Sequence, residues 1–242
     1  MKTKTLLIAA AALAAGIISS QAQSVYSQNV VGYANVATPV GGVNYLLAVP
    51  FKVGVSNGAN EVFPSLPEFS EILIWNPLSV NYTFAKSDTG SGTGWSDAFD
   101  GPVPVPVLPV GLGFFLKPAS GVTNTIAGSV AINTGTSNVM TLATGGVNYL
   151  IGCAVPYAGS VTNGNDSGGG PNLNALPEFS EMLVWNPNTV SYTFAKTDTG
   201  SATGWSDAFD GPVAVPSITV GQGFFLKPAA SNAKWITGLP AQ

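Results

Sequence analysis

An internal repeat constrains the fold of this chain more than any other feature. Residues 66–118 align with residues 176–228 at an offset of 110, and 41 of these 53 aligned positions are identical. Upstream, residues 41–46 match residues 145–150 at an offset of 104. Two stretches this similar are expected to adopt the same structure twice. The sequence therefore predicts two tandem homologous modules, at residues 23–134 and 135–242.

The pattern inside each module is that of β-strands. Residues 80–85 alternate between apolar and polar side chains, which is typical of a half-buried strand. The apolar run 72–75 precedes them, and the intervening Asn76-Pro77 favours a turn, so the pair predicts a β-hairpin that recurs in module two. No segment of the mature chain has a helical period. We expect an all-β fold, with each module a β-sandwich or small barrel. Further strands are predicted at residues 30–36, 45–51, 113–117 and 123–132.

The first 22 residues have the features of a signal peptide. Lys2 and Lys4 precede an apolar run at 6–18, and Ser20 and Ala22 supply the small residues that a signal peptidase needs. The most apolar later stretch, 103–116, is interrupted by proline and glycine, which excludes a bilayer span there. We therefore expect cleavage near Ala22, a secreted, extracellular or cell-envelope location, and no membrane span in the mature chain.

The composition excludes several classes of function. The chain has no histidine and no arginine, which removes histidine general bases, histidine metal ligands and arginine clamps on phosphate. Without the leader, six lysines face twelve acidic residues, so a nucleic acid is not an expected partner. Cys153 is the single cysteine and lies in an apolar run, which predicts a buried thiol without an internal disulfide.

Three recurring motifs give a family resemblance. Each module contains Trp-Asn-Pro, then Tyr-Thr-Phe, and near its end Gly-x-Gly-Phe-Phe, at residues 75–77, 82–84 and 111–115 in module one. With the leader, this pattern resembles uncharacterised secreted β-repeat proteins of environmental Gram-negative bacteria. The resemblance implies export and a β architecture, and it carries over no catalytic residue.

Duplicated carboxylates are the candidate metal ligands. Oxygen ligands from aspartates and nearby carbonyls suit Ca²⁺, although residues 88–92 lack the second and third acids of the common calcium loop. Ordinary turns are the alternative, because aspartate beside glycine is common in turns. Asp97 with Asp100 could also form a glycosidase pair if the two met across a cleft. The six candidate calcium ligands are Asp88, Asp97, Asp100, Asp198, Asp207 and Asp210.

Two tryptophans are the candidate sugar-binding residues. Trp95 and Trp205 are surrounded by glycine, serine, threonine and aspartate, which predicts loop positions where an indole could stack on a sugar ring. Packing of each ring over its own module is the alternative. Trp75 and Trp185 end apolar strands and are expected in the core. The candidate ligand-binding set is Trp95, Asp97, Asp100, Trp205, Asp207 and Asp210.

These observations predict an exported, non-enzymatic protein with a structural or adhesive role. Its expected partners are further copies of itself, the extracellular matrix or a polysaccharide, and calcium is the one cofactor considered. Duplicated binding modules gain avidity from linkage, which favours a carbohydrate-binding module as the alternative. A carboxylate-based glycoside hydrolase is the third hypothesis, and tandem copies of one active site would be unusual.

Overall fold

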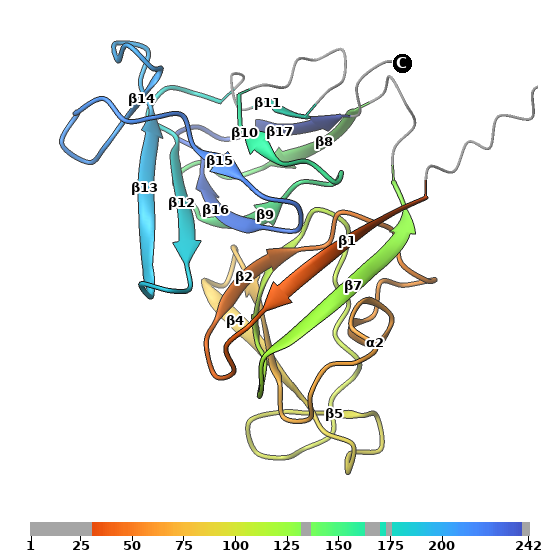
Figure 1. Cartoon of the computed structure of the whole chain (residues 1–242). Helices are drawn as coiled ribbons and strands as arrows, with labels where there is room; N and C mark the ends of the chain where they lie inside the picture. Colours follow the sequence, from red (N-terminus) through yellow and green to blue (C-terminus); the bar gives the residue numbers. More distant parts are fainter. Residues whose placement is uncertain (1–30, 132–136, 163–169, 173–175, 239–242) are drawn as a thin grey trace, which may run out of the picture.

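A computed structural model describes residues 31–131, 137–162, 170–172 and 176–238 (Figure 1). These residues form an all-β protein of several antiparallel sheets, and no closed barrel occurs among them. The predicted leader, 1–22, and the predicted module boundary at residue 134 lie outside the described residues. No helix in the described ranges is long and apolar enough to cross a bilayer.

Two five-stranded sheets with the same strand order dominate the structure, one in each repeat. Residues 23–134 and 135–242 are called repeat 1 and repeat 2 below. The sheet of repeat 1 has the order β2-β6-β3-β4-β5, and that of repeat 2 has the order β9-β16-β12-β13-β14. The strands of repeat 1 are β2 (Tyr45–Ala48), β3 (Glu71–Asn76), β4 (Asn81–Ser87), β5 (Trp95–Ser96) and β6 (Gly113–Lys117). Those of repeat 2 are β9 (Tyr149–Gly152), β12 (Glu181–Asn186), β13 (Ser191–Thr197), β14 (Trp205–Ser206) and β16 (Gly223–Lys227).

Smaller sheets accompany the two large ones. In repeat 1, β1 (Val31–Thr38) pairs with β7 (Val122–Ser129), and in repeat 2, β8 (Ser137–Leu142) pairs with β17 (Ala233–Gly238). Repeat 2 adds β11 (Gly170–Asn172) beside β17, and it pairs β10 (Gly159–Ser160) with β15 (Ser217–Ile218). Within the described ranges, repeat 1 has only the single bridge Gly58–Val107 where repeat 2 pairs β10 with β15, and it has no counterpart of β11. It also contains the four-residue helix α2 (Ala59–Val62). The sequence pattern did not predict this helix.

The predicted strands are mostly present, with shifted ends. The hairpins β3–β4 and β12–β13 and the strand at 113–117 are confirmed. The strand expected at 45–51 ends at Ala48, two residues before Pro50, which has no N–H to donate to a ladder. The strand expected at 123–132 covers 122–129, and the strand expected at 30–36 covers 31–38.

Each large sheet buries one face in the core of its own repeat and turns the other toward the other repeat. Alternate residues of β3 separate accordingly, because Ile72 belongs to the core of repeat 1 whereas Leu73 and Trp75 pack between the sheets. The cluster between the sheets centres on four buried side chains from the two repeats. These are Leu46, Phe115, Leu150 and Phe225.

Contacts across this interface are reciprocal. Trp75 Nε1 donates to the Asn148 carbonyl at 2.6 Å, and Trp185 Nε1 donates to the Asn44 carbonyl at the same distance. The backbone follows the same rule, because the Ala48 amide donates to the Gly221 carbonyl and the Gly152 amide to the Gly111 carbonyl. Equivalent residues thus exchange roles, as in a two-fold symmetric dimer interface, here within one chain.

Candidate functional site

The loop tryptophans are core residues, so the prediction that they stack on a sugar was wrong. Trp95 and Trp205 are each only 2 % exposed and belong to the hydrophobic cores of their own repeats. They lie on the short strands β5 and β14. Trp95 Nε1 also donates to Asn60 Oδ1 at 2.7 Å, which satisfies the indole N–H next to α2. The sequence did not predict this burial, because the residues next to both tryptophans are polar. Whether a ring on a strand is buried depends on what packs against that face of the strand.

The strand-end tryptophans have a different place from the one predicted. Trp75 and Trp185 are partly buried and lie between the two sheets, not inside the core of either repeat. One sequence signal could have revealed this position. The run 72–75 is apolar at every residue, and a strand without polar alternation is covered on both faces.

Asp97 and Asp207 hold their own turns together. Asp97 Oδ1 accepts hydrogen bonds from the Phe99 amide at 2.8 Å and the Gly101 amide at 2.9 Å, and Asp207 makes the same two bonds in repeat 2. This pattern is the Asx turn that favours aspartate in tight loops. Asp88 and Asp198 likewise accept from the amides of Gly90 and Gly200, at 2.9 Å each.

Asp100 and Asp210 make ion pairs. Asp100 pairs with Lys86, and Asp210 with Lys196. Hydrogen bonding to Asp100 raises the pKa of Lys86, and hydrogen bonding to Asp210 does the same for Lys196. Each carboxylate thus has a separate role, and in the described part of the chain no three or more acidic or cysteine side chains converge as a metal site would require. Asp97 is thus engaged within its turn, and Asp100 with a lysine.

The same loops display an apolar surface that the sequence analysis missed. Phe99 is 92 % exposed at the turn that Asp97 holds, and Phe69, just before β3, is 58 % exposed. Lys86 connects them, because its Nζ lies 5.9 Å from the centre of the Phe69 ring and pairs with Asp100, the neighbour of Phe99. We call the four residues Phe69, Lys86, Phe99 and Asp100 a tip patch.

Repeat 2 presents the same tip patch. Its residues are Phe179, Lys196, Phe209 and Asp210, and Phe209 is also 92 % exposed. Figure 1 shows β5 at the bottom of the molecule and β14 at the upper left, so the two loops lie at opposite ends. Exposed Phe99 could have been suspected from the sequence, because it stands in a turn-like Asp-Ala-Phe-Asp-Gly segment that both repeats share.

Comparisons of this chain with protein-family models, with curated proteins and with solved structures give no match.

Proposed function

We propose that this is an exported, non-enzymatic structural protein that adheres to further copies of itself through its two tip patches. The observation that carries the proposal is the pair of nearly fully exposed phenylalanines, Phe99 and Phe209, each on a turn fixed by an aspartate. The leader-like residues 1–22 support the exported location.

In the isolated chain the phenylalanine rings of both tip patches remain exposed to water. Burying a phenylalanine side chain stabilises a protein by about 1.5–3 kcal/mol, and neither tip gains this in the single chain. Exposed apolar groups that lie close together and are bordered by polar groups are typical of an interaction surface, and each tip joins two exposed phenylalanines to a lysine and an aspartate. Because the turn is already held by the aspartate, association would require little ordering of the backbone.

The chemistry of the patch fits a second copy of itself. A lysine and an aspartate stand beside the rings in each patch, so two patches related by a two-fold axis could exchange their ion pairs while burying their phenylalanines. The low charge of the chain, 8 % of its residues, lets such chains approach without strong repulsion. With one patch at each end, association extends into chains and does not close at a dimer.

Sedimentation velocity of the purified protein over a concentration series tests this proposal. We expect species larger than one chain whose share grows with concentration, and only single chains for the double variant Phe99→Ser, Phe209→Ser. Val55→Ser is the matched control, since Val55 is 93 % exposed but belongs to neither patch, and this variant should associate like the wild type. Wild-type protein that stays a single chain up to its solubility limit would refute the proposal, as would association unchanged in the double variant.

A further inference from the structure

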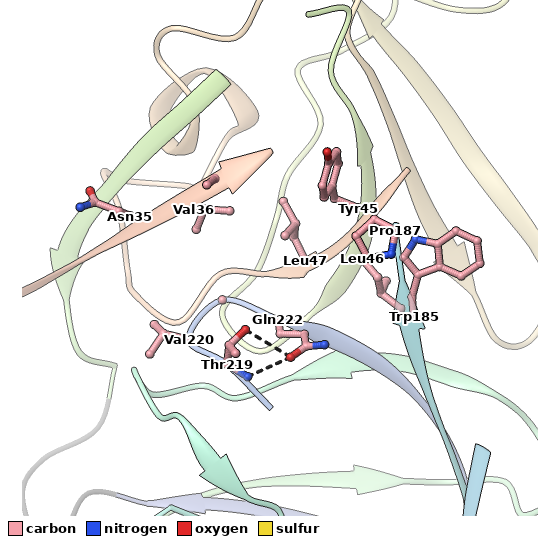
Figure 2. A pocket seen from close by; sticks show the side chains of 12 residues that line it. Asn35, Val36, Tyr45, Leu46, Leu47, Trp185, Pro187, Thr219, Val220 and Gln222 are labelled. Carbon is pink, nitrogen blue, oxygen red and sulfur yellow. Dashed lines mark hydrogen bonds between the residues drawn. The ribbon is translucent and has the colours of Figure 1, made fainter. Parts of the chain in front are cut away.

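A cavity of about 390 Å³ opens at the junction of the two repeats (Figure 2). Strands β1 and β2 of repeat 1 form one side of it. The other side comes from repeat 2, from the end of β12 with Pro187 and from the loop 219–222 before β16. The volume falls in the range of small-molecule binding sites. No residue of this cavity belongs to the tip patches, so ligand binding here is independent of the proposed self-association.

Gln222 offers unused hydrogen-bond donors to this cavity. Its Oε1 accepts from the Thr219 amide at 2.9 Å and from Thr219 Oγ1 at 3.2 Å, which fixes the orientation of the carboxamide. In Figure 2 the oxygen faces Thr219, and the nitrogen lies on the side of Leu46 and Trp185. Among the described residues, no hydrogen bond uses the Gln222 Nε2 protons. A preset amide with two free donors is suited to the hydroxyl oxygens of a ligand.

Trp185 provides a rigid aromatic wall. Its Nε1 donates to the Asn44 carbonyl, its ring lies 4.8 Å from that of Tyr192, and Phe115 meets it edge-on at 6.0 Å. These contacts fix the ring while it still lines the cavity. An aromatic ring held in this way can pack against the apolar face of a sugar ring at little entropic cost.

The lining excludes charged ligands. No lysine, aspartate or glutamate occurs among the described residues that line the cavity, and the one titratable group is the hydroxyl of Tyr45. That hydroxyl is already used, because it accepts from the Val40 amide at 2.9 Å and donates to the Val40 carbonyl at 3.2 Å. A carboxylate or phosphate placed here would have no cation to balance it.

We propose that this cavity binds one unit of a neutral saccharide, with the sugar ring against Trp185 and its hydroxyls on Gln222 and Thr219. The combination of one flat ring, one oriented amide and no charge matches a molecule with apolar ring faces and neutral hydroxyls. Because few polar groups take part, the dissociation constant is expected on the order of a millimolar.

The repeats themselves supply the control for this site. The positions equivalent to Thr219 and Gln222 are Pro109 and Leu112, which offer no side-chain hydrogen bond, although the surrounding Val-Gly and Gly-Phe-Phe residues are identical. The polar pair therefore occurs at only one of the two equivalent loops. Gln222→Leu copies a residue that the chain already accommodates at the equivalent backbone position, so this variant should fold.

The experiment is a titration of the purified protein, monitored by tryptophan fluorescence and by calorimetry. The panel holds neutral hexoses and their disaccharides, with a uronic acid and a hexose phosphate as charged counterparts. We expect one site per chain for at least one neutral sugar, binding at least tenfold weaker in Gln222→Leu at an unchanged melting temperature, and no binding of the charged counterpart of that sugar.

Trp75→Phe is the matched control for Trp185→Phe. Both substitutions remove an indole that bonds a carbonyl of the other repeat, but only Trp185 lines the cavity. Binding should persist in Trp75→Phe and weaken severalfold in Trp185→Phe. The proposal fails if no neutral sugar in the panel binds, if Gln222→Leu binds as well as the wild type, or if the two tryptophan variants lose affinity equally.

Discussion

At the scale of single residues, several of the aspartates stabilise the loops by accepting hydrogen bonds from backbone amides. Asp97 shows this most clearly, because one carboxylate oxygen accepts two amide hydrogen bonds within a turn of five residues. The sequence predicts that this aspartate lies in a duplicated loop, but it does not predict whether the carboxylate binds a metal, a sugar or the backbone of the loop. The conformation of the turn determines which of these groups the carboxylate reaches.

The effect of a substitution at Asp97 on the free energy of unfolding should therefore depend on whether the new side chain can accept hydrogen bonds, and not on its charge. Asp97→Ala leaves two amides without their acceptor and should lower the free energy of unfolding by about 1–2 kcal/mol. Asp97→Asn keeps an acceptor oxygen and should stay within about 0.5 kcal/mol of the wild type. Urea unfolding measures both, with Asp207→Ala as the counterpart in repeat 2. Equal losses in the alanine and asparagine variants would show that the charge matters.

Cys153 is buried, as its apolar surroundings predicted, at 5 % exposure. Burial raises the pKa of its thiol from its ordinary value to about 12. In the native protein the thiol should react with a disulfide reagent at pH 8 about 1000-fold more slowly than in urea, because the thiolate is the reactive form and a pKa of about 12 lowers its fraction by that factor. Comparable rates in both states would contradict the burial.

The raised pKa of Cys153 makes the free energy of unfolding depend on pH in the alkaline range. The folded pKa lies above the unfolded one, so the contribution of the neutral thiol is complete below the unfolded pKa and is lost as the pH rises through about 12. Cys153→Ala should reduce the fall in the free energy of unfolding across this alkaline range, measured by urea titration at several pH values.

At the scale of elements, the hairpins β3–β4 and β12–β13 were the most predictable part of the fold. Their residues alternate with period two, and Asn-Pro marks the turn, so both local signals agree. The tryptophans were less predictable, since Trp95 follows polar residues yet lies in the core. Which face of a strand is buried depends on the sheet that packs against it. Trp75 packs against the sheet of the other repeat, and it donates its hydrogen bond to Asn148, which lies 73 residues away along the chain.

Both hairpin turns contain a strained valine, which gives a prediction at this scale. Val80 and Val190 have φ angles of 52° and 51°, in the left-handed region that β-branched residues avoid. Each is 68 % exposed, so replacement loses little packing. Val80→Asn should raise the free energy of unfolding by about 1 kcal/mol, and Val190→Asn by a similar amount. Thermal and urea unfolding would measure this gain in the free energy of unfolding. A variant less stable than the wild type would show that the valine side chain contributes more packing than its exposure indicates.

At the scale of the whole molecule, the chain is arranged like a two-fold dimer with its two halves connected. The reciprocal bonds of Trp75 and Trp185 link the two large sheets, while the loops of β5 and β14 extend in opposite directions (Figure 1). Most positions of residues 66–118 and 176–228 are identical, but Thr219 and Gln222 differ from Pro109 and Leu112. These two unlike residues line the cavity at the junction together with residues that both repeats share.

The most direct test of end-to-end self-association is the number of chains per assembly in a variant that has lost one of its two tip patches. Light scattering behind size exclusion should show wild-type assemblies whose mass keeps rising with concentration. Phe99→Ser keeps only the patch of repeat 2, so its mass should level off at two chains, and Phe209→Ser should do the same through the patch of repeat 1. A single-tip variant that keeps growing like the wild type, or wild-type protein that stops at two chains, would contradict association through both tips.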